Sequence, residues 1–165
     1  MSDKTRIILG IDPGVADTGF GVISKEGHTL ILLEAGSIQT HKSKSLPERL
    51  ENIYHAMHDL LKKYQPDLVA VEKLYFARNV TTALDVGQAR GVAILAMREH
   101  KVEILEFTPL QIKQAVTGNG RADKRQVGLM VKTILKIQDV PKPDDAADAV
   151  AAAICGAAFN PKLVK

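Results

Sequence analysis

The chain has 165 residues, of which 45% are hydrophobic and 25% charged. These values are typical of one globular domain over 1–165 with an adequate core, and the single cysteine excludes an internal disulfide and a cysteine-based zinc site. The net charge of +3 identifies no partner by itself. No apolar stretch approaches the about 20 residues that a membrane span needs, and the N-terminus lacks a signal-peptide pattern, so we expect a cytoplasmic location.

Hydrophobic periodicity and turn residues predict alternating elements along the chain. The predicted strands are 7–11, 18–24, 30–39, 68–73 and 102–107, and the predicted helices are 47–64, 81–99, 109–117, 124–136 and 146–159. A hairpin followed by strand–helix alternation indicates an α/β fold, a five-stranded mixed sheet with helices on both faces. Gly19 and Gly21 within the second strand indicate that another backbone or a ligand passes close to it. We expect 161–165 to be a mobile tail.

Four acidic residues stand where core elements begin or end. Asp12 and Glu72 each end an apolar strand, and Asp145 and Asp148 open an alanine-rich helix. The first and fourth strands can lie side by side, so that their carboxyl ends meet at the ligand-binding edge of the sheet. The two helical aspartates are three residues apart, which places both in the first turn and on one helix face.

Together these carboxylates predict a metal site. Two carboxylates about 5 Å apart repel each other by roughly 3 kcal/mol at an effective dielectric of 20, unless a cation neutralises them. Hard oxygen ligands suit Mg²⁺ or Mn²⁺ better than zinc. Two such ions can activate water and stabilise the leaving oxygen of a phosphodiester.

Each acid also has a purely structural interpretation. Asp12 precedes Pro-Gly and can serve as a turn former, and Glu72 can sit at an exposed strand end. Asp145 can cap its helix, a role for which Asp144 competes. Asp148 is hardest to explain in this way, because it lies inside an apolar helix. One shared site explains all four acids better than four separate coincidences.

A basic block between residues 108 and 138 suggests a polyanionic partner. Its only acidic residue is Asp123, against the cations Lys113, Arg121, Lys124, Arg125, Lys132 and Lys136. The alternative is a solvated helix face, the usual fate of charge runs. The aromatic residues Tyr75 and Phe76 favour nucleic acid over that alternative.

The helix 81–99 is apolar on nearly every side, which indicates a helix that is internal or shared with a second subunit. A symmetric dimer contact is therefore expected, and two-fold symmetry would suit a substrate with its own two-fold axis. Cys155, among alanines, is expected to be a buried inert thiol. His55 and His58 are expected in solvent, and His28, His41 and His100 suggest no site.

With these residues in order, the chain resembles the RuvC family of Holliday junction resolvases, which have the ribonuclease H-like fold. The resemblance runs from about Ile7 to Ala157. It is carried by six stretches in sequence: Gly10-Ile-Asp-Pro-Gly14 with Thr18-Gly-Phe-Gly21, Val71-Glu72, Gly87-Gln-Ala-Arg-Gly91, Pro109-Leu-Gln-Ile-Lys113, Thr117-Gly-Asn-Gly-Arg-Ala-Asp-Lys124 and Asp145-Ala-Ala-Asp-Ala149.

The resemblance implies that the four acids are metal-binding catalytic residues using two Mg²⁺, with Mn²⁺ able to substitute. It implies a homodimer that cuts opposed strands of a four-way DNA junction, with a branch-migration helicase complex as a further candidate partner. Candidate DNA-binding residues are Tyr75, Phe76, Arg78, Lys113, Arg121, Lys124 and Arg125. Where the family usually has Phe, this chain has Tyr75 followed by Phe76, so either aromatic ring can be the one that stacks on bases. Where the family commonly has Gln, this chain has Lys73, so a side-chain amide contact is lost there.

Two rival functions remain open at this point. An ATP-handling enzyme of the actin and sugar-kinase type also begins with a strand, an Asp and a glycine-rich hairpin, although it needs two such domains around the nucleotide. A non-catalytic junction-binding dimer would keep the fold without the chemistry, against which the four acids argue. A third hypothesis is a general nuclease, which cleavage tests on linear duplex and single-stranded DNA would distinguish from a junction resolvase.

Overall fold

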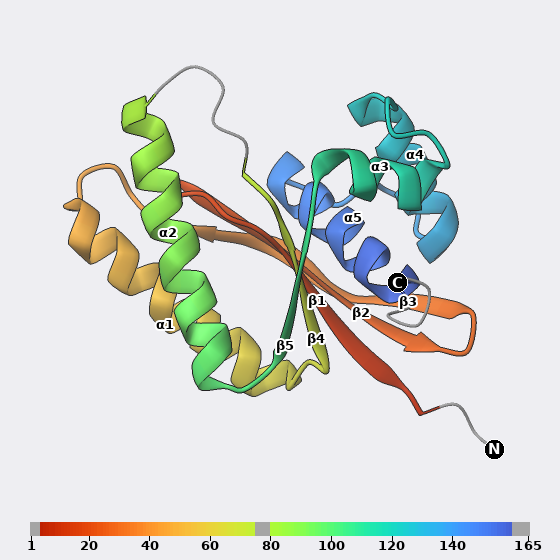
Figure 1. The fold of residues 1–165 in the computed structure, drawn as a ribbon, viewed down its shortest axis with the longest axis horizontal. Coiled ribbons are helices and arrows are strands. Elements are labelled where there is room, and N and C mark those ends of the chain that lie inside the picture. The colour runs from red at the N-terminus through yellow and green to blue at the C-terminus, as the bar shows by residue number, and fades with distance from the viewer. Residues whose placement is uncertain (1–3, 75–79, 160–165) are drawn as a thin grey trace, which may run out of the picture.

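The computed structural model describes residues 4–74 and 80–159, and a five-stranded mixed sheet runs through its centre (Figure 1). The strand order is β3-β2-β1-β4-β5. The bounds are β1 Arg6–Asp12, β2 Asp17–Glu26, β3 Thr29–Gln39, β4 Leu68–Glu72 and β5 Glu103–Phe107. β2 pairs antiparallel with β1 and β3, whereas β4 runs parallel to β1 and β5. The prediction of a mixed sheet is confirmed.

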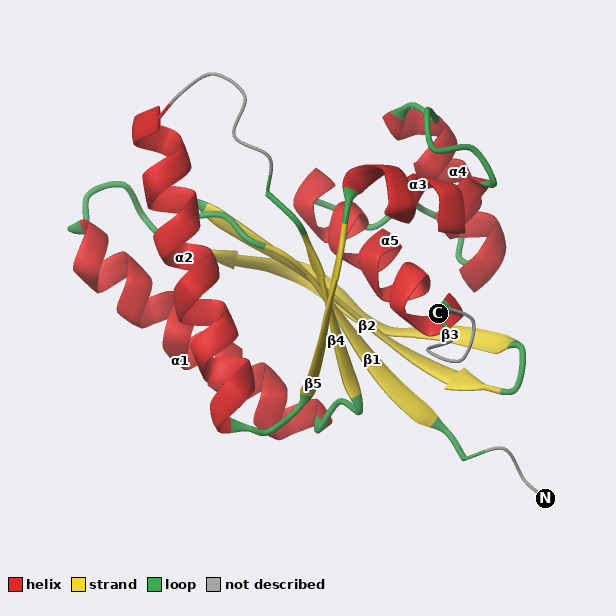
Figure 2. Cartoon of the chain, in the orientation of Figure 1, coloured by secondary structure: helices red, strands yellow, loops and turns green. Residues whose placement is uncertain are grey.

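Helices cover the two faces of the sheet in separate groups (Figure 2). α1 (Leu46–Tyr64) and α2 (Val80–Glu99) lie on one face, and α3 (Pro109–Thr117), α4 (Lys124–Leu135) and α5 (Asp144–Ala158) lie on the other. Side chains alternate along β1, so that Ile8 packs toward α5 while Leu9 packs toward α1 and α2. The sheet is therefore buried on both sides, which explains its nearly continuous apolar strands.

Helix α1 begins where the sequence predicts. The Ser45 hydroxyl accepts a hydrogen bond from the Glu48 backbone N–H, and the Glu48 carboxylate accepts one from the Ser45 backbone N–H. This capping box satisfies two backbone donors that the first turn would otherwise leave without partners.

Helix α5 packs backbone to backbone against β1 and β2. A Cβ added at Gly10 would lie 1.8 Å from the Ala149 carbonyl oxygen, and one at Gly19 would lie 2.0 Å from the Asp145 carbonyl oxygen. Only residues without side chains on the strands, facing small residues on the helix, allow this approach. The prediction that a backbone passes close to β2 is confirmed, and that backbone is α5.

One predicted boundary has consequences for the acids. α5 begins at Asp144, two residues earlier than predicted, because acidic residues in a first turn interact favourably with the helix dipole. Its N-cap is Pro143, which makes no side-chain capping bond, so neither Asp144 nor Asp145 is the cap. Asp148 therefore lies in the second turn, not the first as predicted.

Some predictions fall on residues that the structure does not describe. Tyr75, Phe76 and Arg78, as well as the predicted tail 161–165, lie outside the described residues. Across 4–74 and 80–159, no helix combines the length and the hydropathy required to cross a membrane.

The close contact between α5 and the strands predicts that even one methyl group at Gly10 is harmful. Gly10→Ala should lower the free energy of unfolding by about 3 kcal/mol, since the added Cβ meets backbone atoms of α5 that cannot rotate away. Chemical denaturation would measure this loss. Gly128→Ala, inside α4, is the matched control: its added Cβ meets only side-chain atoms of Val140, at ordinary contact distances of 3.4 and 3.5 Å, so stability should stay the same or rise by up to about 1 kcal/mol. Equal stability of both variants would contradict the packing argument.

Candidate metal centre

Asp12 is the last residue of β1, at the edge of the sheet where parallel strands end. β1 and β4 pair in register up to Ile11 and Val71, so Asp12 and Glu72 are the next residue of each strand. This is the arrangement expected from two adjacent parallel strands whose carboxyl ends share an edge. The prediction that the first and fourth strands are neighbours is confirmed.

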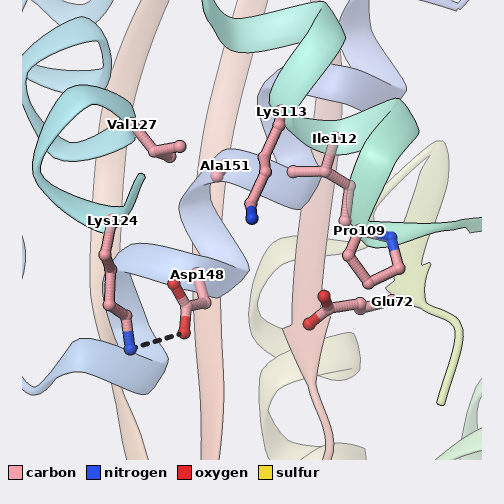
Figure 3. A pocket seen from close by; sticks show the side chains of 8 residues that line it. All are labelled: Glu72, Pro109, Ile112, Lys113, Lys124, Val127, Asp148 and Ala151. Carbon is pink, nitrogen blue, oxygen red and sulfur yellow. Dashed lines mark ion pairs between the residues drawn. The ribbon is translucent and has the colours of Figure 1, made fainter. Parts of the chain in front are cut away.

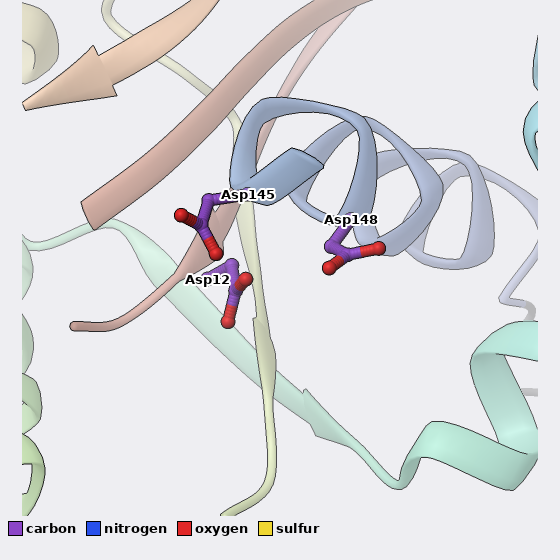
Figure 4. Close-up of side chains that lie close together, drawn as sticks. All are labelled: Asp12, Asp145 and Asp148. Carbon is purple, nitrogen blue, oxygen red and sulfur yellow. The ribbon is translucent and has the colours of Figure 1, made fainter. Parts of the chain in front are cut away.

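Two acids of α5 reach the same edge. Oxygen atoms of Asp12, Asp145 and Asp148 all lie within 4.8 Å of one another (Figure 4). Asp145 and Asp148 project from one face of α5 toward the end of β1, because the glycines of β1 and β2 let the helix lie directly over these strands. The three side chains are each half-buried, so water and ions can still reach them.

Glu72 lies near this group without belonging to it. Its side chain faces Asp148 across a cavity of about 250 Å³, which is also lined by Lys113 and Lys124 (Figure 3). The sequence predicts four acids in one cluster; the structure gives three in close contact and the fourth on the opposite wall of the adjoining cavity.

Burial and mutual repulsion disfavour ionisation of this group. Burial, followed by the charges of Glu72, Asp148 and Asp145, raises the pKa of Asp12 to about 8. Burial and the charge of Asp148 likewise raise the pKa of Glu72, although Lys113 and Lys124 act in the opposite direction. Burial also raises the pKa of Asp148, despite its ion pair with Lys124. Such shifts arise when carboxylates gather without a cation to neutralise them.

The two lysines of the cavity are in different states. The Lys124 ammonium lies 3.3 Å from Asp148 and 3.4 Å from Asp144. Lys113 makes no ion pair with residues 4–74 or 80–159, although its charge lowers the pKa of Glu72. The Lys113 side chain points into the cavity, where its ammonium group can bind an incoming anion (Figure 3).

Two further predicted DNA-binding residues, Arg121 and Arg125, do not line this cavity. Arg121 lies just before α4 and Arg125 in its first turn, and both are exposed. The aromatic candidates Tyr75 and Phe76, together with Arg78, belong to 75–79, which the structure leaves undescribed.

The donor set fits a hard divalent cation. Three carboxylates present oxygen atoms at mutual distances that one ion can span, and a fourth carboxylate lines the adjoining cavity. Burial and the neighbouring acids disfavour ionisation of Asp12 and raise its pKa, and bound cations would favour the ionised form. The structural interpretation of Asp12 as only a turn former does not account for this convergence.

The structure also reveals contacts that the sequence did not. His58 is only partly exposed: its Nδ1 lies 2.7 Å from His100 Nε2, and its Nε2 lies 2.9 Å from Glu99. The expectation that His58 is exposed is met only in part, and His100, for which the sequence suggested no site, lies beside it because the end of α2 brings both rings together. The exposure of His55 and the burial of Cys155 are confirmed.

Comparison with known proteins points to one family. The family model "Crossover junction endodeoxyribonuclease RuvC" matches residues 8–156. The crossover junction endodeoxyribonuclease RuvC of Brevibacillus brevis is 55% identical over 93% of this chain and 92% of its own length. The Thermus thermophilus RuvC structure has a TM-score of 0.85 at 36% identity, covering 92% of this chain and 93% of that chain. T. thermophilus RuvC in complex with Holliday junction substrate gives 0.84 at 34% identity, covering 92% of each chain.

The pKa of Asp12 predicts how the metal-free protein responds to pH. An acid whose pKa is raised on folding, here from 3.8 to about 8, stabilises the fold while protonated, and this contribution is lost as pH rises between those values. Asp12→Asn, which stays neutral, should therefore gain in melting temperature relative to the native protein between pH 5 and pH 8. Differential scanning calorimetry in EDTA would measure the difference. A difference that stays constant or shrinks as pH rises would contradict a pKa of Asp12 that is raised on folding.

Proposed function

The chain belongs to the RuvC family of crossover junction endodeoxyribonucleases, and we propose that Asp12, Glu72, Asp145 and Asp148 are the catalytic carboxylates with which it resolves Holliday junctions. It is a metal-dependent nuclease of homologous recombination and DNA repair, with the ribonuclease H-like fold of its relatives. The observation that carries the assignment of the site is the convergence of three carboxylates within 4.8 Å at the end of β1. An ATP-handling enzyme of the actin type is excluded by the family.

We infer that the cation is Mg²⁺, replaceable by Mn²⁺, and that two ions bind. Oxygen-only donors favour these ions, and four acids on two adjoining walls offer more ligands than one ion needs. Bound there, such ions supply an activated water and stabilise the oxygen that leaves the phosphodiester. Asp12 lies within 4.8 Å of both aspartates of α5, and the charge of Glu72 acts on its pKa, so it is the acid that could serve both ions.

The cavity beside the acids is the proposed seat of the scissile phosphate. Lys113 has no ion-pair partner among the described residues, so its charge is available to orient the phosphodiester. Lys124 holds Asp148 and Asp144 in the DNA-free protein and would share its charge with an incoming phosphate. The products are a 5′-phosphate and a 3′-hydroxyl, so the nicks can be ligated.

Residues beyond the cavity are proposed to hold the rest of the junction. Arg121 and Arg125 are exposed at and before the start of α4 and can follow the phosphate backbone. Tyr75 or Phe76 is proposed to stack on unpaired bases, and Arg78 to bind a nearby phosphate. The partnership with a branch-migration helicase complex stays a prediction of the family resemblance.

A homodimer is proposed to form through α2. The exposed side chains Val80, Leu84 and Leu95 are 76%, 62% and 54% exposed. They share one helical stripe with Gly87 and Gly91, because spacings of four, three, four and four residues return to the same face. A Cβ at either glycine would meet nothing within 4 Å. The opposite face, which includes Ala89 and Ala93, is buried against the core. The stripe has the spacing of a helix–helix seam, and its glycines permit close approach of a second α2.

Cleavage of synthetic four-way junctions tests the proposed site. The native protein should make paired nicks with Mg²⁺ and none in EDTA, whereas Asp12→Asn should cut at least about 100-fold more slowly because the central ligand is lost. Junction binding, measured by gel shift in EDTA, should stay within about three-fold. Asp59→Asn, an exposed acid on α1, is the control and should cut normally. If Asp12→Asn cuts at the native rate, the carboxylate centre is not the site of cleavage. Parallel reactions with linear duplex and single-stranded DNA measure how selective the cleavage is for junctions.

The α2 stripe predicts a variant that separates folding from dimerisation. Gly91→Leu should leave the folded chain as stable as before, since the new side chain points into open space and leucine favours helix more than glycine does. It should nevertheless shift the protein from dimer to monomer at micromolar concentration, because leucine blocks the close approach of two helices. Sedimentation equilibrium would measure the mass of both proteins. A native monomer, or a Gly91→Leu dimer of native affinity, would contradict the proposed interface.

A further inference from the structure

The turn that follows Asp12 is tied to the rest of the fold by two threonine hydroxyls and one backbone N–H. β1 ends at Asp12 and β2 begins at Asp17, so residues 13–16 form the connection, and Asp12 itself pairs with Gly19. The carbonyl oxygens of Gly14, Val15 and Ala16 each accept a hydrogen bond from a threonine. Three consecutive backbone groups of one short turn are thus fixed from outside it.

Thr18 is the first of these threonines. Its side chain is fully buried, and its Oγ1 donates to the Gly14 carbonyl oxygen at 2.6 Å while accepting from the Gly14 backbone N–H at 3.4 Å. One hydroxyl therefore closes the turn on itself. Loss of that hydroxyl would leave a half-buried carbonyl without its partner.

Thr40 is the second, and it acts from the far end of β3. Its Oγ1 donates to the Val15 carbonyl oxygen at 2.5 Å and its backbone N–H donates to Ala16 at 3.0 Å. Arg49 of α1 in turn donates its Nε–H to Thr40 Oγ1 at 2.8 Å. The turn is therefore fastened to an element on the α1 face of the sheet, independently of the acids.

We propose that Thr18 and Thr40, with Arg49 behind Thr40, are positioning residues that hold the Asp12 carboxylate against the repulsion of the other acids. The inference rests on the proposed metal-dependent function. When all three acids are ionised, as cation binding requires, their oxygens within 4.8 Å of one another repel and push their carriers apart. Asp145 and Asp148 sit on a helix fixed by its glycine contacts, so the end of β1 is the part that could yield. The hydroxyl bonds oppose that movement.

The turn also borders the site directly. Gly14, Val15 and Ala16 line a cavity of about 390 Å³ together with Arg49 and Asp145. This cavity meets the acid group at Asp145, whereas the cavity of Lys113 meets it at Asp148. The carboxylates therefore lie between two cavities, and the turn 13–16 forms a wall of the larger one.

The test compares loss of a hydroxyl with loss of a methyl group at the same position. Thr18→Val should weaken Mn²⁺ binding to the DNA-free protein by about 10-fold, because the Gly14 carbonyl in the turn after Asp12 loses the hydrogen bond that fixes it. Thr18→Ser keeps the hydroxyl and should stay within about three-fold. Isothermal titration calorimetry measures the affinity. The Mg²⁺ concentration for half-maximal single-turnover cleavage should shift by the same factor, with junction binding in EDTA unchanged.

A control separates positioning from general destabilisation. Val131→Ala removes buried side-chain volume on α4, away from the turn, and should lower the melting temperature without changing Mn²⁺ affinity. Thr40→Val and Thr40→Ser repeat the comparison at a second position and carry it alone if Thr18→Val does not fold. Valine variants that bind Mn²⁺ as the native protein does would overturn the proposal. A native protein that binds Mn²⁺ without cutting junctions would instead overturn the proposed function, while the positioning role of Thr18 and Thr40 would still hold.

Discussion

The site depends on one contact, the direct packing of the α5 backbone on β1 and β2. An ordinary side chain at Gly10 or Gly19 would meet a carbonyl oxygen of α5 at 2.0 Å or less, so the helix could not lie where it does. Lifted by the thickness of even a methyl group, α5 would carry Asp145 and Asp148 away from Asp12. The glycines of the strands and the alanines of the helix are therefore requirements of the carboxylate geometry as much as of the core.

This packing forces together groups that repel one another. Burial and three neighbouring acids raise the pKa of Asp12 to about 8, so ionising this group costs free energy when no cation is bound. A domain with a marginal net stability tolerates such a cost only where the surrounding structure fixes the groups strongly. Here the glycine contacts fix α5 from one side, and the bonds of Thr18 and Thr40 fix the turn after β1 from the other.

Much of this could be predicted from the sequence, because it depends on local patterns. Apolar runs predicted all five strands within a few residues, and acids at the ends of such runs indicated the candidate metal site. Gly19 and Gly21 indicated a close backbone, since a glycine inside a strand has few other uses. The separation of Glu72 from the other three acids could not be predicted, because it depends on the direction of its side chain at the end of β4.

The contacts that escaped prediction join residues far apart in the chain. The His58–His100 pair depends on how α1 crosses the end of α2, and the bond from Arg49 to Thr40 depends on where β3 ends relative to α1. Hydroxyl groups carry little periodic signal, since a threonine reads equally well as a strand residue or a cap. The apolar pattern of α2 did indicate a shared surface, yet only the structure shows that its glycines lie on the uncovered face.

The positions of β4 and α2 connect the chemistry to the proposed assembly. Glu72 ends β4, and the chain next enters α2 at Val80, the first residue of the exposed stripe. The acid centre and the proposed dimer seam are thus separated by only a short segment, the one that holds Tyr75 and Phe76. A two-fold axis at α2 would set the spacing and the opposite orientation of two acid centres, because α2 packs on the strands that Asp12 and Glu72 end. A rigid α2 seam would then determine which two phosphates of a junction can be reached together, and the accuracy of paired cutting would follow from the packing of the dimer more than from either centre alone.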